Sequence, residues 1–469
     1  MTAQLSLRWA VSAISDDREV ARRRLVALIF FIYWLLIFEG ALRKWVFQDV
    51  QQYLFFLRDP FVILVYVYAI KTNWWPRLSP LLAGGLALWV AGLVLALAEL
   101  LQGSDAVVVA YGWRNYFLYL PLAFIIASVF READLNRLVS HSLMISIPIA
   151  ILVIFQFLSP SEAIVNAGLI DVYQPGVNGA IVRTYGTFTS SAGESPFVVS
   201  LLAFALAAWI LPKDRRPLGG LLLLMASAAV ITCLALSGSR GAFIHAVLVL
   251  IFALSSSFLL PQANLRTRAR ILPFAMCLVA VVLLTTVFSQ ALEALLIRSA
   301  GAYVGESDVY LFGTFGRAFS GFTALFPLLF TTPLLGYGLG SFGNAFGSLS
   351  STTLLPPSVI AEDDWARNVA ELGPSIAIFY IAFRIALVIW MGRAAFIATR
   401  RSNNPLPLLL FGFCGILLVT GQITGQGSVN GFAWLFAGFC MAANRLTDPL
   451  STADLSIDQR SPHRAGEAP

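Results

Sequence analysis

Residues 30–36 read FFIYWLL and residues 278–287 read LVAVVLLTTV, two apolar runs that contain no charged side chain. A strand of a membrane barrel would instead alternate apolar and polar residues over about 10 positions. Backbone polar groups in lipid must also be satisfied within the segment itself, which an α-helix achieves. The two runs therefore predict helices that lie in a bilayer.

The composition of the whole chain agrees with this interpretation. Only 12% of the 469 residues are charged and 58% are hydrophobic, whereas soluble domains carry about 25% charged residues. A soluble globular enzyme is thereby excluded. The net charge of +6 comes from cations between apolar runs rather than from a patch with interleaved aromatic residues, so we expect no nucleic-acid partner.

About 20 apolar residues cross one bilayer, and the chain has room for about 12 transmembrane helices. We predict an all-α polytopic membrane protein with a cytoplasmic segment over 1–24, a single transmembrane domain over 25–445 and a disordered cytoplasmic tail over 446–469. The predicted spans are 25–42, 54–70, 80–100, 114–130, 139–158, 196–211, 217–236, 241–260, 271–289, 373–392, 406–421 and 430–443.

The basic residues predict the orientation of these spans. Of 31 Lys and Arg residues, 21 lie in the N-terminal segment, in the breaks after the even-numbered spans and in the tail. Cytoplasmic loops carry such an excess, so we expect both termini in the cytoplasm. The opposite face then holds two long loops, 159–195 and 290–372. Within the second, residues 321–335 are apolar but short, which predicts a re-entrant or interfacial helix, or half of a broken span.

Several cations on the outer face are candidates for binding an anion. Arg240 follows Ser-Gly-Ser, and glycine lets backbone N–H groups approach a phosphate. Its alternative role is an arginine that extends to the membrane interface. Arg183 lies late in the first long loop, where pairing with Glu194 or Asp171 is the alternative. Arg317 lies in the second loop, and Arg114, Arg298 and Arg367 are further candidates.

Two other features of the second long loop stand out. Gly336, Gly338 and Gly340 have the spacing GxGxG without a βαβ unit, so they predict a tight turn rather than a dinucleotide site. Glu362, Asp363 and Asp364 precede the tenth span, where a carboxylate could accept a proton or simply favour a helix N-terminus. The four cysteines lack metal-ligand spacing, and we interpret them as core residues; no metal or cofactor is expected.

Taken in order, five motifs carry a family resemblance over about residues 180–375. They are RTYGTF at 183–188, SGSRGA at 237–242, GR at 316–317, PLLGYGLGSF at 333–342 and ELG at 371–373. The chain resembles the bacterial O-antigen ligase and Wzy-type O-antigen polymerase superfamily of integral-membrane GT-C type glycosyltransferases.

The resemblance implies an inner-membrane enzyme of polysaccharide and lipopolysaccharide biosynthesis with a periplasmic active site. It would transfer glycan from an undecaprenyl-pyrophosphate carrier to the sugar hydroxyl of a glycan or lipid-linked acceptor by inverting displacement. Arg183, Arg240 and Arg317 would hold the pyrophosphate. Ligases of the family carry a His-Asn pair where this chain has Glu362 and Asp363, so we expect a polymerase-like role with Glu362 as base and Asp363 as its neighbour or substitute.

Two other classes of function remain compatible with the sequence. A transporter or flippase for an anionic or lipid-linked substrate would also use twelve spans and intramembrane arginines. A non-catalytic component of an envelope complex would explain the spans but not the placement of the charges.

Overall fold

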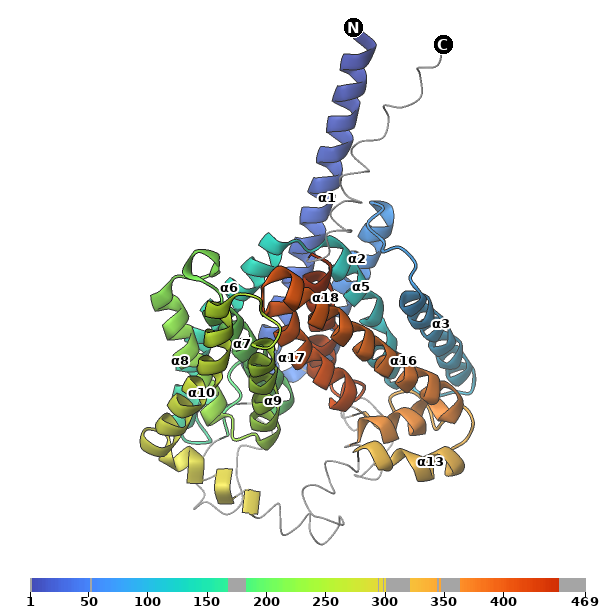
Figure 1. Cartoon of the computed structure of the whole chain (residues 1–469). Helices are drawn as coiled ribbons and strands as arrows, with labels where there is room; N and C mark the ends of the chain where they lie inside the picture. The colour runs from blue at the N-terminus through green and yellow to red at the C-terminus, as the bar shows by residue number, and fades with distance from the viewer. Residues whose placement is uncertain are drawn as a thin grey trace.

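The computed structural model describes residues 2–50, 53–167, 183–293, 295–297, 299–300, 321–343, 346 and 363–446. Over these residues the protein is all-helical and contains no strand. The helices form one bundle from which the beginning of α1 projects (Figure 1). An α-helical membrane protein is thus the fold class that the structure supports.

Each of the twelve predicted spans coincides with helical structure. The helices are α1 (Thr2–Ala41), α2 (Asp59–Lys71), α3 (Pro80–Leu101), α4 (Ala106–Trp113), α5 (Leu120–Val129), α6 (Glu132–Leu158), α7 (Ser191–Ile210), α8 (Gly220–Leu236), α9 (Arg240–Ser256), α10 (Ala263–Thr286), α13 (Leu325–Thr331), α16 (Asp364–Ser402), α17 (Leu406–Thr420) and α18 (Gly427–Arg445). Short π and 3-10 turns connect some of them, including η1 (Leu42–Val46), η3 (Tyr53–Phe56) and η4 (Arg114–Leu118). The fourth predicted span is therefore a composite of η4 and α5, preceded by α4.

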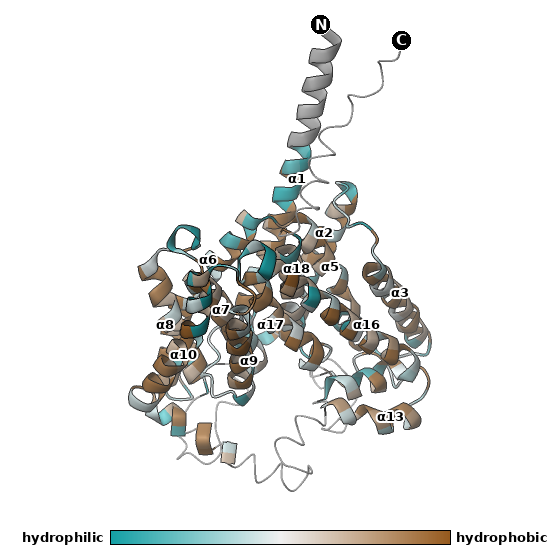
Figure 2. Ribbon diagram, viewed as in Figure 1, coloured by the Kyte–Doolittle hydropathy of each residue, from teal (hydrophilic) through white to brown (hydrophobic). Residues whose placement is uncertain are grey.

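Seven helices in the described part of the chain are long and apolar enough to cross a membrane. They lie within 17–46, 53–71, 80–101, 132–158, 191–210, 263–286 and 364–402. Figure 2 shows apolar residues over most of the bundle, and α10 leaves large apolar side chains such as Phe274 and Leu278 exposed. Such surface suits contact with lipid tails. The total of twelve spans remains a prediction.

The centre of the bundle is formed by helices that are buried on nearly all sides. In Figure 1, α17 and α18 lie between the group α6 to α10 and the pair α3 and α16. The side chains of Trp434 on α18 and Phe413 on α17 are fully buried. A helix that is apolar all round is expected in such a position, and its small residues allow close packing: a Cβ on Gly438 would lie 2.9 Å from the Ala123 carbonyl oxygen of α5.

The predicted basic breaks meet at one end of this bundle. Hydrogen bonds that join them are Trp74 Nε1 to the Arg18 carbonyl, Arg22 Nη1 to the Val129 carbonyl, Arg445 Nη2 to the Phe130 carbonyl, Ser140 Oγ to the Pro217 carbonyl, Arg268 Nη1 to the Leu211 carbonyl and the Gln262 N–H to Asn403 Oδ1. We call this the basic end. Its assignment to the cytoplasm remains a prediction from charge.

Three details differ from the sequence-based expectation or refine it. Helix α13 has seven residues, about 10 Å of helix, so it does not cross the roughly 30 Å hydrocarbon core alone. Helix α16 begins before the predicted span and is broken at Gly373, where φ is 72°. Cys277 is exposed on α10 and is not a core residue, whereas the other three cysteines are buried.

Candidate anion-binding site

Residues 421–427, which connect α17 to α18 and include the first residue of α18, approach two arginine side chains at the end of the bundle opposite the basic end. A Cβ on Gly425 would lie 1.7 Å from Nη1 of Arg367, and a Cβ on Gly427 would lie 3.1 Å from Nη1 of Arg114. Glycine lacks that atom, so guanidinium groups can lie directly against the backbone. We call this segment the 421–427 loop.

Two buried ion pairs lie beside this loop. Arg58 Nε donates to Glu39 Oε2 at 2.7 Å, and Arg114 Nε donates to Asp59 Oδ2 at 2.6 Å. Each pair joins residues that lie far apart in the sequence, 19 and 55 positions respectively. Packing of α1 and η4 against the start of α2 brings distant charges closer than the neighbours in sequence.

One nitrogen of these pairs is left without an acceptor. Arg58 is 1% exposed, and its Nη2 donates to the Gly427 carbonyl at 3.0 Å. Its Nη1 has no hydrogen-bond partner among the described residues. Arg114 Nη1, by contrast, donates to Asn115 Oδ1 at 2.9 Å. Two nitrogens of Arg114 thus donate to protein acceptors, whereas Arg58 retains a buried N–H donor without an acceptor.

Asp364, the first residue of α16, holds the other side of the loop. Its Oδ2 accepts from Arg384 Nη1 at 2.6 Å, and its Oδ1 accepts from the Thr424 N–H at 3.0 Å and from Thr424 Oγ1 at 2.7 Å. This carboxylate is 5% exposed. Asp364 therefore anchors the 421–427 loop to α16 and neutralises Arg384.

Arg367 is the least satisfied charge in this region. It is fully buried, and none of its three guanidinium nitrogens has a hydrogen-bond partner among the residues that the structure describes. Its nearest ionic partner is Asp364 Oδ1, 3.7 Å from Nη1, and the same carboxylate already forms a closer ion pair with Arg384. A buried cation without hydrogen bonds is costly, so Arg367 has the donor capacity to bind an anion.

The predicted glycine turn is present over residues 336–343. Gly336, Gly338 and Gly340 have φ of 77°, 113° and 78°, which a glycine adopts without strain. Two buried carboxylates bind backbone N–H groups of the turn: Glu99 accepts from Leu339, and Glu371 Oε1 accepts from Phe342 at 2.8 Å. The turn is thereby fixed against α3 and α16.

Arg183 and Arg240 are brought to one turn between α8 and α9. Arg183 Nε donates to the Ser237 carbonyl at 3.2 Å. Arg240 is the first residue of α9, whose N-cap Ser239 accepts from the Ala242 N–H at 3.3 Å. The sequence prediction that these arginines share a site is compatible with this arrangement, although they lie nearly 60 positions apart in the chain.

Beside Arg183 lies a buried carboxyl side chain, that of Glu194. Glu194, in the first turn of α7, is 2% exposed. Neither of its oxygens has a hydrogen-bond partner within the described ranges. Glu194 and Arg183 thus lie in the same buried region without a hydrogen bond between them.

A series of contacts connects this turn with the arginines around the 421–427 loop. Thr187 Oγ1 donates to the Ile37 carbonyl at 2.7 Å, and a Cβ on Gly40 would lie 2.4 Å from the Thr187 carbonyl oxygen. Glu39, next to Gly40, binds Arg58. The end of α1 therefore contacts both groups of arginines, the one at the turn between α8 and α9 and the one around the 421–427 loop.

Some predicted site residues cannot be placed. Glu362, Arg298 and Arg317 lie outside the described residues. Asp363 is described and is the N-cap residue of α16, where its backbone carbonyl accepts from the Arg367 N–H at 2.9 Å. The structure therefore groups Arg183 with Arg240, and Arg114 with Arg367 around the 421–427 loop.

Arg384 and the anchoring role of Asp364 were not predicted, and Arg58 was not among the predicted site residues. Charges inside apolar segments are expensive and normally paired or functional, which is the signal that Arg58 and Arg384 offered in the sequence. Their partners could not be read, because Asp364 meets Thr424 across 60 positions.

Comparison with known proteins adds no relative. No family model, curated protein or solved structure matches the chain.

Proposed function

We propose that the protein is a membrane glycosyltransferase of the O-antigen polymerase or ligase type. It would use an undecaprenyl-pyrophosphate-linked glycan as donor and a sugar hydroxyl of a glycan or lipid-linked molecule as acceptor. We further propose that it acts in the bacterial inner membrane, with the site on the periplasmic side.

The observation that carries this proposal is the set of buried guanidinium donors around the 421–427 loop. Arg367 has three nitrogens without acceptors, and Arg58 Nη1 and Arg384 Nη2 have none among the described residues. Buried guanidinium N–H groups without acceptors favour a multiply charged anion, and pyrophosphate offers several oxygens to such donors. Long apolar helices around the site suit an anion that is attached to a lipid.

The chemistry would be a single displacement at the anomeric carbon of the donor. The acceptor oxygen forms the new bond to that carbon while the bond to the pyrophosphate oxygen breaks, and the pair of electrons leaves with the pyrophosphate. Arg183, Arg240, Arg317 and Arg367 would stabilise the charge that develops there. Glu362, with Asp363 as neighbour or substitute, would accept the hydroxyl proton.

Chain extension by the purified protein from a lipid-linked repeat unit tests the proposal. We expect Arg367→Gln to lower the rate by about 10²–10³-fold, as for loss of one preorganised charge contact, and Glu362→Gln by about 10²–10⁴-fold. Arg268→Gln is the matched control, because Arg268 binds a carbonyl at the basic end. Unchanged extension by Glu362→Gln and Arg240→Ala would refute the assigned roles.

The break in α16 also favours a second candidate, a transporter or flippase of a lipid-linked or anionic substrate. Gly373 has φ 72° within an otherwise helical segment, and discontinuous helices bind substrates in transporters. Translocation of a labelled lipid-linked substrate in vesicles, without a new covalent bond, would support this function over transfer.

A further inference from the structure

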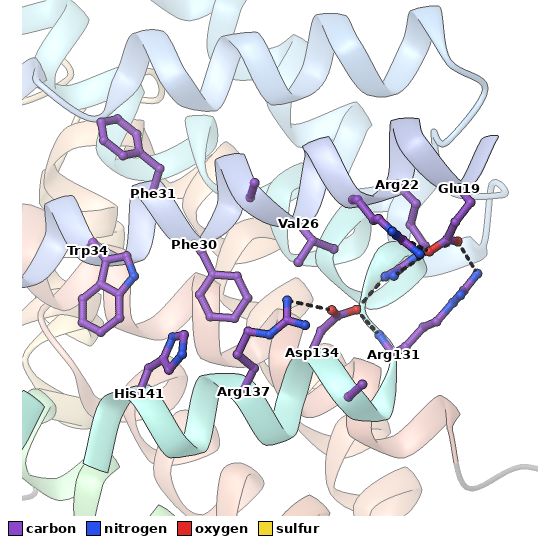
Figure 3. A pocket seen from close by; sticks show the side chains of 13 residues that line it. Glu19, Arg22, Val26, Phe30, Phe31, Trp34, Arg131, Asp134, Arg137 and His141 are labelled. Carbon is purple, nitrogen blue, oxygen red and sulfur yellow. Dashed lines mark hydrogen bonds and ion pairs between the residues drawn. The ribbon is translucent and has the colours of Figure 1, made fainter. Parts of the chain in front are cut away.

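A groove of about 810 Å³ lies between α1 and α6 at the basic end. Figure 3 shows its two halves: Glu19, Arg22, Arg131 and Asp134 gather at one end of the view, and Phe30, Trp34 and His141 lie toward the other. From Glu19 to Trp34 the helix rises about 22 Å. The groove is therefore polar at the basic end and aromatic toward the middle of the bundle.

The polar half carries more positive than negative charge. Four arginines line it, against two carboxylates. Arg22 is buried, and its Nη1 already donates to Asp134 Oδ2 at 2.6 Å and to the Val129 carbonyl at 2.9 Å. The remaining three arginines have side chains that are largely exposed: Arg23 is 74%, Arg131 is 56% and Arg137 is 56% exposed.

These three arginines keep donors for a ligand. Arg131 Nη2 lies 2.8 Å from Glu19 Oε2, and Arg137 Nη1 lies 3.8 Å from Asp134 Oδ1. A guanidinium group has five N–H donors in a fixed fork, which matches phosphate geometry. The ion pairs orient the side chains while other N–H groups remain exposed at the rim.

The aromatic half excludes a small hydrophilic anion as the sole occupant. Phe30, Phe31 and Trp34 line it, and the ring of His141 lies 6.2 Å from Phe30 and 6.3 Å from Trp34. Phosphate alone would occupy only the polar half and make no contact with the aromatic half, which lies on helices long and apolar enough to cross a membrane. A molecule with an anionic head and a hydrocarbon chain would cover both halves.

We propose that this groove binds one anionic glycerophospholipid of the surrounding leaflet. Its phosphate contacts Arg23, Arg131 and Arg137, and one acyl chain lies along Phe30, Phe31 and Trp34. The ion pairs of Glu19 and Asp134 join α1 to the start of α6 at this site, so the bound lipid bridges the two helices. This site is independent of the proposed glycosyltransferase site.

The test is quenching of tryptophan fluorescence by brominated lipids in vesicles that contain the full-length protein. Trp34 is isolated as the difference between the wild type and Trp34→Phe. We expect this difference signal to saturate at a low fraction of brominated phosphatidylglycerol in a zwitterionic host, and to require much more brominated phosphatidylcholine. Equal quenching by the two lipids would overturn the proposal.

Arginine variants separate this site from general attraction between charges. Arg131→Gln with Arg137→Gln should weaken the phosphatidylglycerol signal by about fivefold or more, given the usual contribution of one basic residue near an anionic surface. The control pair Lys213→Gln with Arg215→Gln removes two exposed cations at the basic end outside the groove, and should leave the signal unchanged. An equal loss in both pairs, or relief of quenching by inorganic phosphate, would refute a phospholipid site. If the double variant fails to fold, the lipid comparison with Trp34→Phe still decides the outcome.

Discussion

At the scale of single residues, two buried arginines of α16 that both lie near Asp364 differ in their hydrogen bonds. Arg384 is bound by Asp364 and by the Leu418 carbonyl, at 2.6 Å and 2.8 Å. Arg367 is equally buried and has no hydrogen bond among the described residues. A buried charge with a close, hydrogen-bonded partner supports the fold, whereas one whose nearest partner is 3.7 Å away and that has no hydrogen bond leaves its desolvation largely uncompensated.

We therefore expect opposite effects on stability when each arginine is replaced by methionine. Arg367→Met should raise the free energy of unfolding by about 1–4 kcal/mol, because a desolvated cation is removed. Arg384→Met should lower it by about 3–5 kcal/mol, because the Asp364 carboxylate loses its partner. The thermal midpoint in detergent measures both, and an equal loss in the two variants would contradict the assignment of Arg367 as a buried donor without hydrogen bonds.

A substitution at Gly425 tests the role proposed for Arg367. Since a Cβ there would lie 1.7 Å from Arg367 Nη1, Gly425→Ala must displace the end of a flexible side chain. We expect the thermal midpoint to change little while donor turnover falls by at least about tenfold, the range for misplacing a positioned group. Gly427→Ala, with a contact of 3.1 Å to Arg114, is the milder companion variant, and a greater loss of turnover in it would argue against the role of Arg367.

At the scale of elements, the 336–343 turn depends on close backbone contact. A Cβ on Gly112 of α4 would lie 2.2 Å from the Gly340 nitrogen, and a Cβ on Gly340 would lie 2.4 Å from the Val108 carbonyl oxygen. The left-handed glycines were predictable from their spacing. Their contact with α4 was not, because nothing local links residue 112 to residue 340.

Gly112→Ala should consequently destabilise the protein by about 1–3 kcal/mol, the usual cost of overpacking against atoms that cannot move aside. Gly84→Ala is the control on α3, where the added Cβ would lie 3.9 Å from the Phe383 ring. That change should raise stability by up to about 1 kcal/mol through helix propensity. Thermal unfolding of the two variants tests the pair, and equal midpoints would mean that the turn does not pack as described.

At the scale of the whole molecule, the two ends of the bundle differ in their charges. Hydrogen bonds join the basic breaks at one end. The 421–427 loop and the turn at Ser237–Arg240 lie toward the other. A positive-inside orientation then places the candidate site on the outer side.

Labelling of single cysteines tests this orientation. In a background without native cysteines, Ser104→Cys between α3 and α4 should react with a membrane-impermeant maleimide in intact spheroplasts. Arg215→Cys, exposed at the basic end, should react only after permeabilisation. The reverse pattern would invert the topology and move the candidate site to the cytoplasmic side.

The sequence by itself determined the helical fold class and the grouping of basic breaks, because apolar run length and charge distribution act locally along the chain. It also predicted the 336–343 turn, since glycine spacing is local. Tertiary structure alone decided which charges meet: Glu39 with Arg58, Asp59 with Arg114, and Asp364 with Arg384. A buried charge selects the nearest partner in space, and in a bundle of long helices that partner is seldom its neighbour in sequence.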